Sequence, residues 1–131
     1  MIKNFKPQLW LTFNNSQANI RLTVLSNFKT EQSSNDYINS LCKKNLFKEA
    51  LRAFDFLQNN TSFQIRLGTY ALLISACSSL KSLEYGKKIH NHIMASECQP
   101  DIILQNHIVN MYGKCGSLKD ARKVFDHMPQ Q

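Results

Sequence analysis

The 131-residue chain is poor in the residues that interrupt helices, with only four glycines and three prolines. It has no C-x-x-C pair, no glycine-rich phosphate loop and no G-x-S-x-G sequence, which argues against a zinc ribbon, a nucleotide hydrolase and a serine hydrolase. Its longest apolar run, Tyr70–Cys77, is far shorter than the roughly 20 residues that a bilayer-spanning helix needs. These absences favour helices joined by short turns, without a membrane span.

Paired cysteines are also absent, because Cys42, Cys77, Cys98 and Cys115 occur singly and far apart. Cys42 and Cys77 fall at the ends of apolar helix stretches, where a cysteine acts as a small hydrophobic residue. This spacing predicts reduced thiols in an intracellular compartment rather than a disulfide framework.

Acidic residues are missing from residues 1–30, which contain four basic residues and many Asn, Ser, Thr and Gln side chains. A cationic, hydroxylated and acid-poor beginning is typical of an organellar transit peptide, so residues 1–30 are predicted to be a targeting head. A disordered tail without a targeting role is the alternative. The whole chain carries a net charge of +7, which favours a polyanionic partner.

The strongest positive feature is a register that repeats along the chain. Ala50, Gly86 and Ala121 stand in matching segments, 36 and 35 positions apart. A period in this range is typical of stacked helical hairpins, in which each hairpin covers the apolar face of its neighbour. The sequence therefore predicts an all-α solenoid of antiparallel helix-turn-helix repeats, about three in number.

The predicted repeats are residues 31–66, 67–101 and 102–131. In the first repeat the apolar stripe predicts helices at residues 35–44 and 46–58, with a loop at residues 58–62. The second repeat is predicted to begin its helix near Thr69. The chain ends without a polar capping helix, as expected of a fragment of a longer array or of a marginal short protein.

Several residues are suited to begin or end these helices. Ser33 or Ser34 is predicted to cap the first helix, and Asn45 to end it in a left-handed conformation. Ser82 and Asp101 are the predicted N-caps of later helices.

The last helix shows a near match to a capping box, with Ser117 at the cap and Asp120 three residues on. The predicted buried stripe of this helix is Ala121, Val124, Phe125 and Met128. One repeat earlier, Gly86 costs about 1 kcal/mol relative to alanine, which predicts a close approach of two helix backbones.

Two segments resemble known repeat motifs. Residues 106–129, with the run Tyr112-Gly113-Lys114-Cys115-Gly116, resemble the short-type motif of plant pentatricopeptide repeat proteins. Residues 69–80 together with 86–90 resemble the long-type motif, and the first hairpin is a looser match. The chain is thus similar to the N-terminal portion of a protein from the subgroup that alternates these motif types.

This resemblance implies binding of single-stranded RNA in mitochondria, or alternatively in chloroplasts, as part of cytidine-to-uridine editing or other RNA processing. Each repeat of the family reads about one base with its fifth residue and its last residue. The implied base-contact residues are Asn35 with Arg66, Ala71 with Asp101, and Asn106. Ile103 matches the apolar residue that clamps a base, whereas Gln32 and Gly68 do not.

The residue chemistry agrees with these roles in outline. A short amide such as Asn106 presents a donor and an acceptor to a base edge, although a structural cap or a solvent-facing role is an equal alternative. Lys43 and Lys114 occupy equivalent positions near the ends of first helices, where a phosphate would lie. The alternative to phosphate binding is that these lysines form a solvated basic face. That interpretation is preferred for the pairs Lys87-Lys88 and Arg122-Lys123.

A metal or catalytic site is not predicted. His90 and His92 point about 200° apart on a helix, so with Cys98 and His107 they make no zinc-ligand pattern. His90 falls on the buried stripe and is interpreted as a packing residue. The H-x-E and P-C-x-x-C signatures of cytidine deaminases are absent. We therefore expect no enzyme activity, no cofactor, no metal, no membrane contact and no small-molecule substrate.

Two alternatives to RNA binding remain from the sequence. Tetratricopeptide arrays have a similar hairpin and a nearby period, which allows a protein-binding helical scaffold. A truncated array with no binding activity of its own is the other. Besides RNA, other RNA-processing proteins are possible partners.

Overall fold

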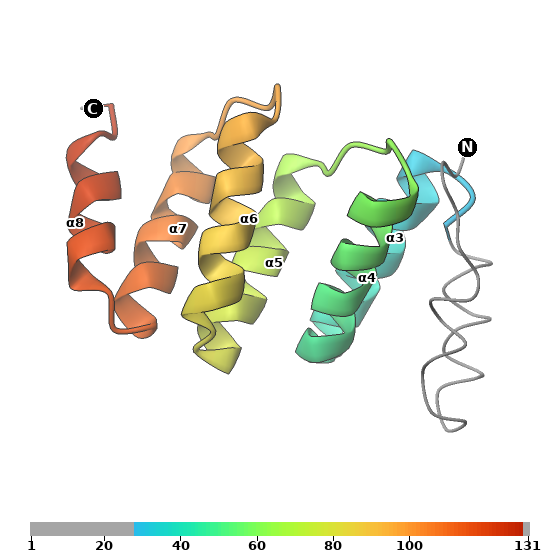
Figure 1. Ribbon diagram of the computed structural model, residues 1–131, viewed down its shortest axis with the longest axis horizontal. Coiled ribbons are helices and arrows are strands. Elements are labelled where there is room, and N and C mark those ends of the chain that lie inside the picture. Colours follow the sequence, from blue (N-terminus) through green and yellow to red (C-terminus); the bar gives the residue numbers. More distant parts are fainter. Residues whose placement is uncertain (1–27, 130–131) are drawn as a thin grey trace.

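The structure is a computed structural model that describes residues 28–129, and those residues form six helices. The helices are α3 (Glu31–Lys43), α4 (Phe47–Asn60), α5 (Leu67–Leu80), α6 (Leu83–Ala95), α7 (Ile102–Lys114) and α8 (Leu118–Asp126). Consecutive helices pair as three antiparallel hairpins that stack along one axis (Figure 1). The predicted all-α solenoid is confirmed. The predicted targeting head lies almost wholly outside the described residues.

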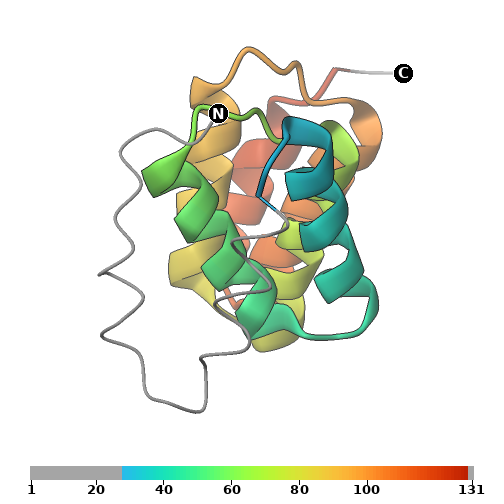
Figure 2. The same cartoon turned by 90° about the vertical axis from the view of Figure 1, so that its right-hand side faces the viewer.

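The hairpins stack in two layers, which Figure 2 shows side by side. Helices α3, α5 and α7 form the first-helix layer, and α4, α6 and α8 form the outer layer. Apolar side chains at helical spacing hold the two layers together. Each repeat of the sequence therefore forms one hairpin of the stack. None of the helices in residues 28–129 is long and apolar enough to cross a membrane.

Helix α3 begins earlier than the apolar stripe suggested, and its cap is not Ser33 or Ser34. Thr30 is the N-cap, and its Oγ1 accepts from the Ser33 amide at 2.9 Å. The Ser33 hydroxyl in turn accepts from the Thr30 amide at 3.0 Å, which completes a capping box. Serine thus takes the place usually held by Glu or Gln in this motif. Asn45 adopts the predicted left-handed conformation, with φ of 62°.

The predicted loop at residues 58–62 is wrong in its first part, because α4 continues through Asn60. Asn60 is buried, and its side-chain amide donates to the Phe56 carbonyl one turn earlier at 3.0 Å. This local bond lets a turn-forming residue end the helix instead of breaking it. Helix α5 begins at Leu67, two positions before the predicted Thr69.

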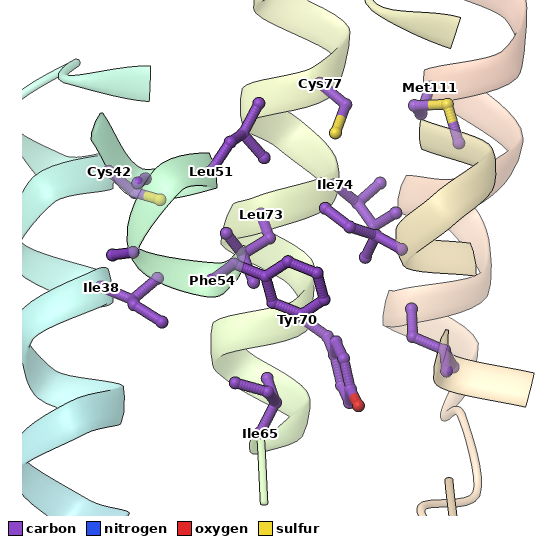
Figure 3. Packing of buried hydrophobic residues seen from close by; sticks show 14 of the residues in the cluster. Ile38, Cys42, Leu51, Phe54, Ile65, Tyr70, Leu73, Ile74, Cys77 and Met111 are labelled. Carbon is purple, nitrogen blue, oxygen red and sulfur yellow. The ribbon is translucent and has the colours of Figure 1, made fainter. Parts of the chain in front are cut away.

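The core is continuous from the first hairpin to the third. Phe54, Tyr70 and Leu73 are fully buried where α4 meets α5 (Figure 3). Phe28 closes the first end of the core and stacks on Phe56, with ring centroids 4.9 Å apart. Each such side chain contributes roughly 1.5–3 kcal/mol by leaving water.

The small residue at position 86 makes room for a side chain rather than for a backbone. A Cβ atom on Gly86 would lie 2.3 Å from Sδ of Met111, which is fully buried. The predicted backbone contact is therefore replaced by the thioether of α7, a flexible group that fills irregular space.

The prediction for α8 is only partly right. Ala121 is buried, but Phe125 is 62 % exposed, because no further hairpin lies against α8 within residues 28–129. Helix α8 ends at Asp126, so Met128 lies beyond it. The Ser117 hydroxyl donates to the Asp120 carboxylate at 2.5 Å instead of capping a backbone amide, so the predicted capping box does not form.

Candidate nucleic-acid interface

Helix α7 presents an exposed row on the first-helix layer. The row consists of Ile103, Asn106, Asn110 and Lys114, spaced three or four residues apart. Residues at this spacing lie on one side of a helix. Ile103 is 62 % exposed although it is a large apolar residue. The row therefore offers an apolar surface, two amides and a cation in succession.

Asn106 lies in the second turn of α7, whose first turn is stabilised by an N-cap. The Asp101 carboxylate accepts from the Leu104 amide at 2.8 Å, which confirms its predicted N-cap role. Asn106 follows one turn later and is exposed. Its amide can present both a donor and an acceptor to a partner. Asp101 itself stays exposed.

Asn35 occupies the same register position in the first repeat but faces inward. It is 1 % exposed, and its Nδ2 donates to the Glu31 carbonyl at 2.8 Å and the Gln64 carbonyl at 2.9 Å. Its Oδ1 accepts from the Arg66 amide at 2.9 Å. The side chain therefore fastens the segment before α5 onto α3, and in this geometry it offers nothing to a base.

The other predicted base-contact residues offer fewer oriented hydrogen-bonding groups. Arg66 is an exposed residue just before α5, and Ala71 is half-buried and has no hydrogen-bonding side chain. Gly68, at the clamp position of the second repeat, is exposed and has no side chain to press on a ring. The second repeat therefore has no apolar side chain at the position that Ile103 occupies in the third.

Lys43 and Lys114 each form the last residue of a first helix, and both are exposed. A cation at a helix C-terminus is favoured by the partial negative charge of the free carbonyls. The equivalent position in the second repeat holds Ser79, which is also exposed. The layer thus places two cations at equivalent helix ends, separated by a hydroxyl.

Two polar contacts fix the spacing of the first helices. The Thr69 hydroxyl donates to Oδ1 of Asn39 at 2.8 Å, between α5 and α3. The Ser75 hydroxyl and His107 Nδ1 are 3.3 Å apart, between α5 and α7. Neither contact was predicted, and Asn110 was missed too, although its i+4 spacing from Asn106 was a readable signal.

Ion pairs cross the outer layer at Lys87 and Lys88, which the interpretation of these residues as a solvated basic face did not include. Lys88 Nζ lies 2.6 Å from Oδ1 of Asp55, and the Tyr85 hydroxyl donates to the other oxygen at 2.5 Å. Lys87 lies 3.7 Å from Asp120. Each lysine thus contacts a neighbouring repeat although both are about half exposed.

Two histidines of α6 make tyrosine contacts between helices. His92 Nδ1 lies 2.7 Å from the Tyr70 hydroxyl and its Nε2 pairs with Gln58, while His90 Nδ1 lies 2.7 Å from the Tyr112 hydroxyl. Burial lowers the pKa of both imidazoles below the ordinary value of 6.5. The predicted packing role of His90 is consistent with this contact. In the described part of the chain, no three His, Cys, Asp or Glu residues are grouped to hold a metal.

The thiols have the environment expected of small hydrophobic residues. Cys42 and Cys77 are buried and free, and burial raises the pKa of Cys77 to about 12. Cys98 and Cys115 are half-buried and free as well. Thiols with raised pKa values, such as those of Cys42 and Cys77, are poor nucleophiles.

Comparisons with known proteins agree with this arrangement. The pentatricopeptide repeat model matches residues 33–60 and 106–131. A mitochondrial pentatricopeptide repeat-containing protein of Arabidopsis thaliana is 59 % identical over 92 % of this chain, which covers 16 % of that protein. A chloroplastic one from the same plant is 35 % identical over 72 % of the chain and 13 % of its own length. The chain therefore spans only a small part of the relatives it matches.

The repeat period, the two-layer stack and these matches lead to one conclusion. This chain belongs to the pentatricopeptide repeat family.

Proposed function

We propose that this chain binds single-stranded RNA as the recognition part of an organellar RNA-processing factor. Proteins of its family are in general RNA-binding organellar factors. The observation that carries the proposal is the exposed row on α7, where Ile103, Asn106 and Lys114 follow one another. An exposed apolar residue beside an open amide, with a cation about three turns further along the helix, suits an RNA strand, whose nucleotides offer ring faces, hydrogen-bonding edges and phosphates.

In the proposed mechanism, an extended RNA strand lies across the first-helix layer. One base stacks on Ile103 and presents its edge to Asn106, while Asn110 offers a second amide one turn further along α7. Lys114 and Lys43 pair with phosphates. Because each such contact releases a counterion, affinity falls as salt rises.

The repeats contribute unequally in this proposal. The third repeat supplies base recognition through Asn106. The first repeat supplies a phosphate contact through Lys43, since Asn35 is committed to the Gln64 and Arg66 backbone. The first repeat also ends on the exposed Arg66. The second repeat supplies the exposed Asp101 at its end and Ala71 as a shape constraint.

The finer setting is part of the same proposal. One similar relative is named mitochondrial, which favours a mitochondrial location, and another is named chloroplastic, which keeps the chloroplast as the alternative. Cytidine-to-uridine editing within the subgroup of alternating motif types suits a chain that supplies recognition. The deaminase signature is absent from its sequence, so the chemistry would come from elsewhere.

The proposal is tested by titrating labelled single-stranded RNA pools into the full chain at several salt concentrations. Asn106→Ala and Lys114→Ala should each weaken binding by about threefold to tenfold, the worth of one or two hydrogen bonds or one phosphate contact. Lys48→Ala, an exposed cation on α4, is the matched control and should leave affinity unchanged. Equal loss in Lys114→Ala and Lys48→Ala, with no loss in Asn106→Ala, would reduce the binding to nonspecific charge. Capture of a peptide ligand without RNA would support the scaffold alternative, and no binding of either would support an array that is inactive alone.

A further inference from the structure

A hollow of about 440 Å³ lies between the second and third repeats, lined by α6, Pro100, α7 and α8. We name it the outer hollow, because α6 and α8 belong to the outer layer. Its lining includes six polar or aromatic side chains that could contact a ligand: Lys87, His90, Asn91, Gln105, Tyr112 and Lys123. Its size falls within the range of roughly 300–1,000 Å³ that is usual for ligand pockets.

The corresponding space between the first and second repeats is filled. Phe54 and His92 pack there edge to face, with ring centroids 5.3 Å apart, and the Tyr70 hydroxyl lies 2.7 Å from His92 Nδ1. Phe54 and Tyr70 are both fully buried (Figure 3). Three rings from α4, α5 and α6 thus close the first interface.

The repeat offsets of 36 and 35 residues identify what replaces these rings. Phe54 becomes His90, and Tyr70 becomes Gln105. His92 becomes His127, which is exposed and has its Nδ1 2.7 Å from the Lys123 carbonyl on its own helix. Two smaller polar residues and a ring turned to solvent leave the second interface open.

The charges change in the same direction. In the first interface Lys88 is neutralised by Asp55, at 2.6 Å. Their counterparts in the second interface are Lys123 and Asn91, so an amide stands where the carboxylate was. The outer hollow therefore exchanges a neutral ion pair for a lysine beside an uncharged side chain.

A further cation enters the wall of the outer hollow. Lys87 takes the position that the buried Leu51 holds in the first interface. Asp120, 3.7 Å from Lys87, is the acid among the lining residues, and its carboxylate also accepts from Ser117. Two lysines against one carboxylate leave the hollow with a surplus positive charge.

Gln105, which lines the outer hollow, has a buried acceptor without a donor. Gln105 Nε2 donates to the Pro100 carbonyl at 3.2 Å, which fixes the orientation of the amide. Its Oε1 is buried and has no hydrogen-bond partner in the structure. A buried acceptor of this kind costs free energy that a bound donor recovers.

We propose that the outer hollow binds a nucleoside monophosphate, with the phosphate at Lys87 and Lys123 and the base inside. The base would lie against Tyr112 and Ile108. Its amino or imino group would donate to Oε1 of Gln105 after a shift of that side chain exposes the oxygen to the hollow. The aromatic base, the hydrogen-bond donor and the negative charge of this ligand match the apolar side chains, the acceptor and the lysines of the lining. The site lies on the other side of α7 from the exposed row of Ile103, Asn106, Asn110 and Lys114. It departs from the expectation that the chain has no small-molecule partner.

The test is a titration of the full, isotope-labelled chain with each of the four ribonucleoside 5′-monophosphates, followed by amide chemical shifts and calorimetry. Saturable shifts centred on Asn91, Gln105 and Lys123 are expected. The double variant His90→Phe, Gln105→Tyr copies the filled interface and should weaken binding at least about tenfold. Its RNA affinity should stay unchanged, since neither residue belongs to the α7 row.

Two comparisons keep the outcome decisive. Lys123→Gln, an exposed change that leaves packing alone, should weaken the nucleotide severalfold, whereas Lys48→Gln on α4 should not. Inorganic phosphate and the free nucleoside should each bind more weakly than the nucleotide. Absence of saturable shifts at the outer hollow, or equal affinity in the filled variant with a native circular dichroism spectrum, would overturn the proposal. If RNA oligonucleotides compete for the same amides, the natural ligand is the terminal nucleotide of an RNA strand rather than a free nucleotide.

Discussion

The first and third repeats place the same amide in opposite environments. Asn35 is sealed by the segment before α5, whose Gln64 carbonyl and Arg66 amide it binds. Asn106 is exposed on α7. The position in a repeat motif therefore sets where the side chain leaves the helix. The segment that connects to the next helix decides whether that side chain is buried in the fold or open to a ligand.

The two repeat interfaces differ in a parallel way. The first is filled with the rings of Phe54, Tyr70 and His92, and the second keeps the outer hollow. A close-packed interface contributes more stability than one with a void, because atoms lining a void lose their contacts. The first interface should thus be the stronger one, and single substitutions can test the difference.

The largest effect is expected from truncating the aromatic residue of the filled interface. Phe54→Ala should lower the free energy of unfolding by about 3–5 kcal/mol, because it leaves a cavity among fully buried neighbours. Its counterpart His90→Ala, beside an existing hollow, should cost only about 1–2 kcal/mol. Urea unfolding followed by circular dichroism measures both. Equal losses would mean that the two interfaces are equally packed.

The paired amides give the second comparison. Asn35→Ala removes three hydrogen bonds and leaves the Arg66 amide without its acceptor, so we expect a loss of about 2–3 kcal/mol. Asn106→Ala removes an exposed side chain and should change stability by less than about 0.5 kcal/mol. RNA affinity should respond in the reverse order. A stable Asn35→Ala variant would contradict the structural role assigned to that amide.

The contrast between these amides also marks how far the sequence could lead. The left-handed Asn45 and the caps Ser82 and Asp101 were predictable, because each depends on residues a few positions apart. The hairpin period was predictable because matching segments recur along the sequence at a nearly constant offset. The Thr30 cap was missed since its partner at the third helical position is a serine rather than Glu or Gln.

The burial of Asn35 could not be predicted in the same way. It depends on Gln64 and Arg66, about thirty residues away, and on how the chain returns to α3. The outer hollow depends on small differences between equivalent positions, such as Tyr70 against Gln105. Such differences leave the helical period intact and change only the volume that the side chains fill.

A smaller effect is expected from pH. Burial lowers the pKa of His92 and His90 below 6.5, so each imidazole binds a proton more readily in the unfolded chain. The stability they support is complete above about pH 6.5 and is lost as the pH falls below it. The midpoint of urea unfolding should therefore decrease from pH 7.5 to pH 5.5, a change to which the titration of other groups adds.

The matched variant isolates the contribution of the two rings. His90→Asn combined with His92→Asn should flatten the decrease between pH 7.5 and pH 5.5, at the cost of lower stability at neutral pH. His92 faces the Tyr70 hydroxyl and Gln58, and His90 faces the Tyr112 hydroxyl with Asp120 nearby, so Asp120 partly opposes the shift for His90 alone. An unchanged slope in the double variant would show that other groups govern the response.

The smallest effects should come from the ion pairs that cross the two interfaces. Asp55→Asn weakens the contacts with Tyr85 and Lys88 in the filled interface and should cost about 0.5–1 kcal/mol, because the pair is close but reaches solvent. Lys87→Gln removes a 3.7 Å contact beside the outer hollow and should cost less than about 0.5 kcal/mol. Raising salt should shrink the first difference, since exposed pairs are screened. If Lys87→Gln proved the more costly change, the lysine would be needed to hold α8 in place, and it could not also be spared for an anion in the outer hollow.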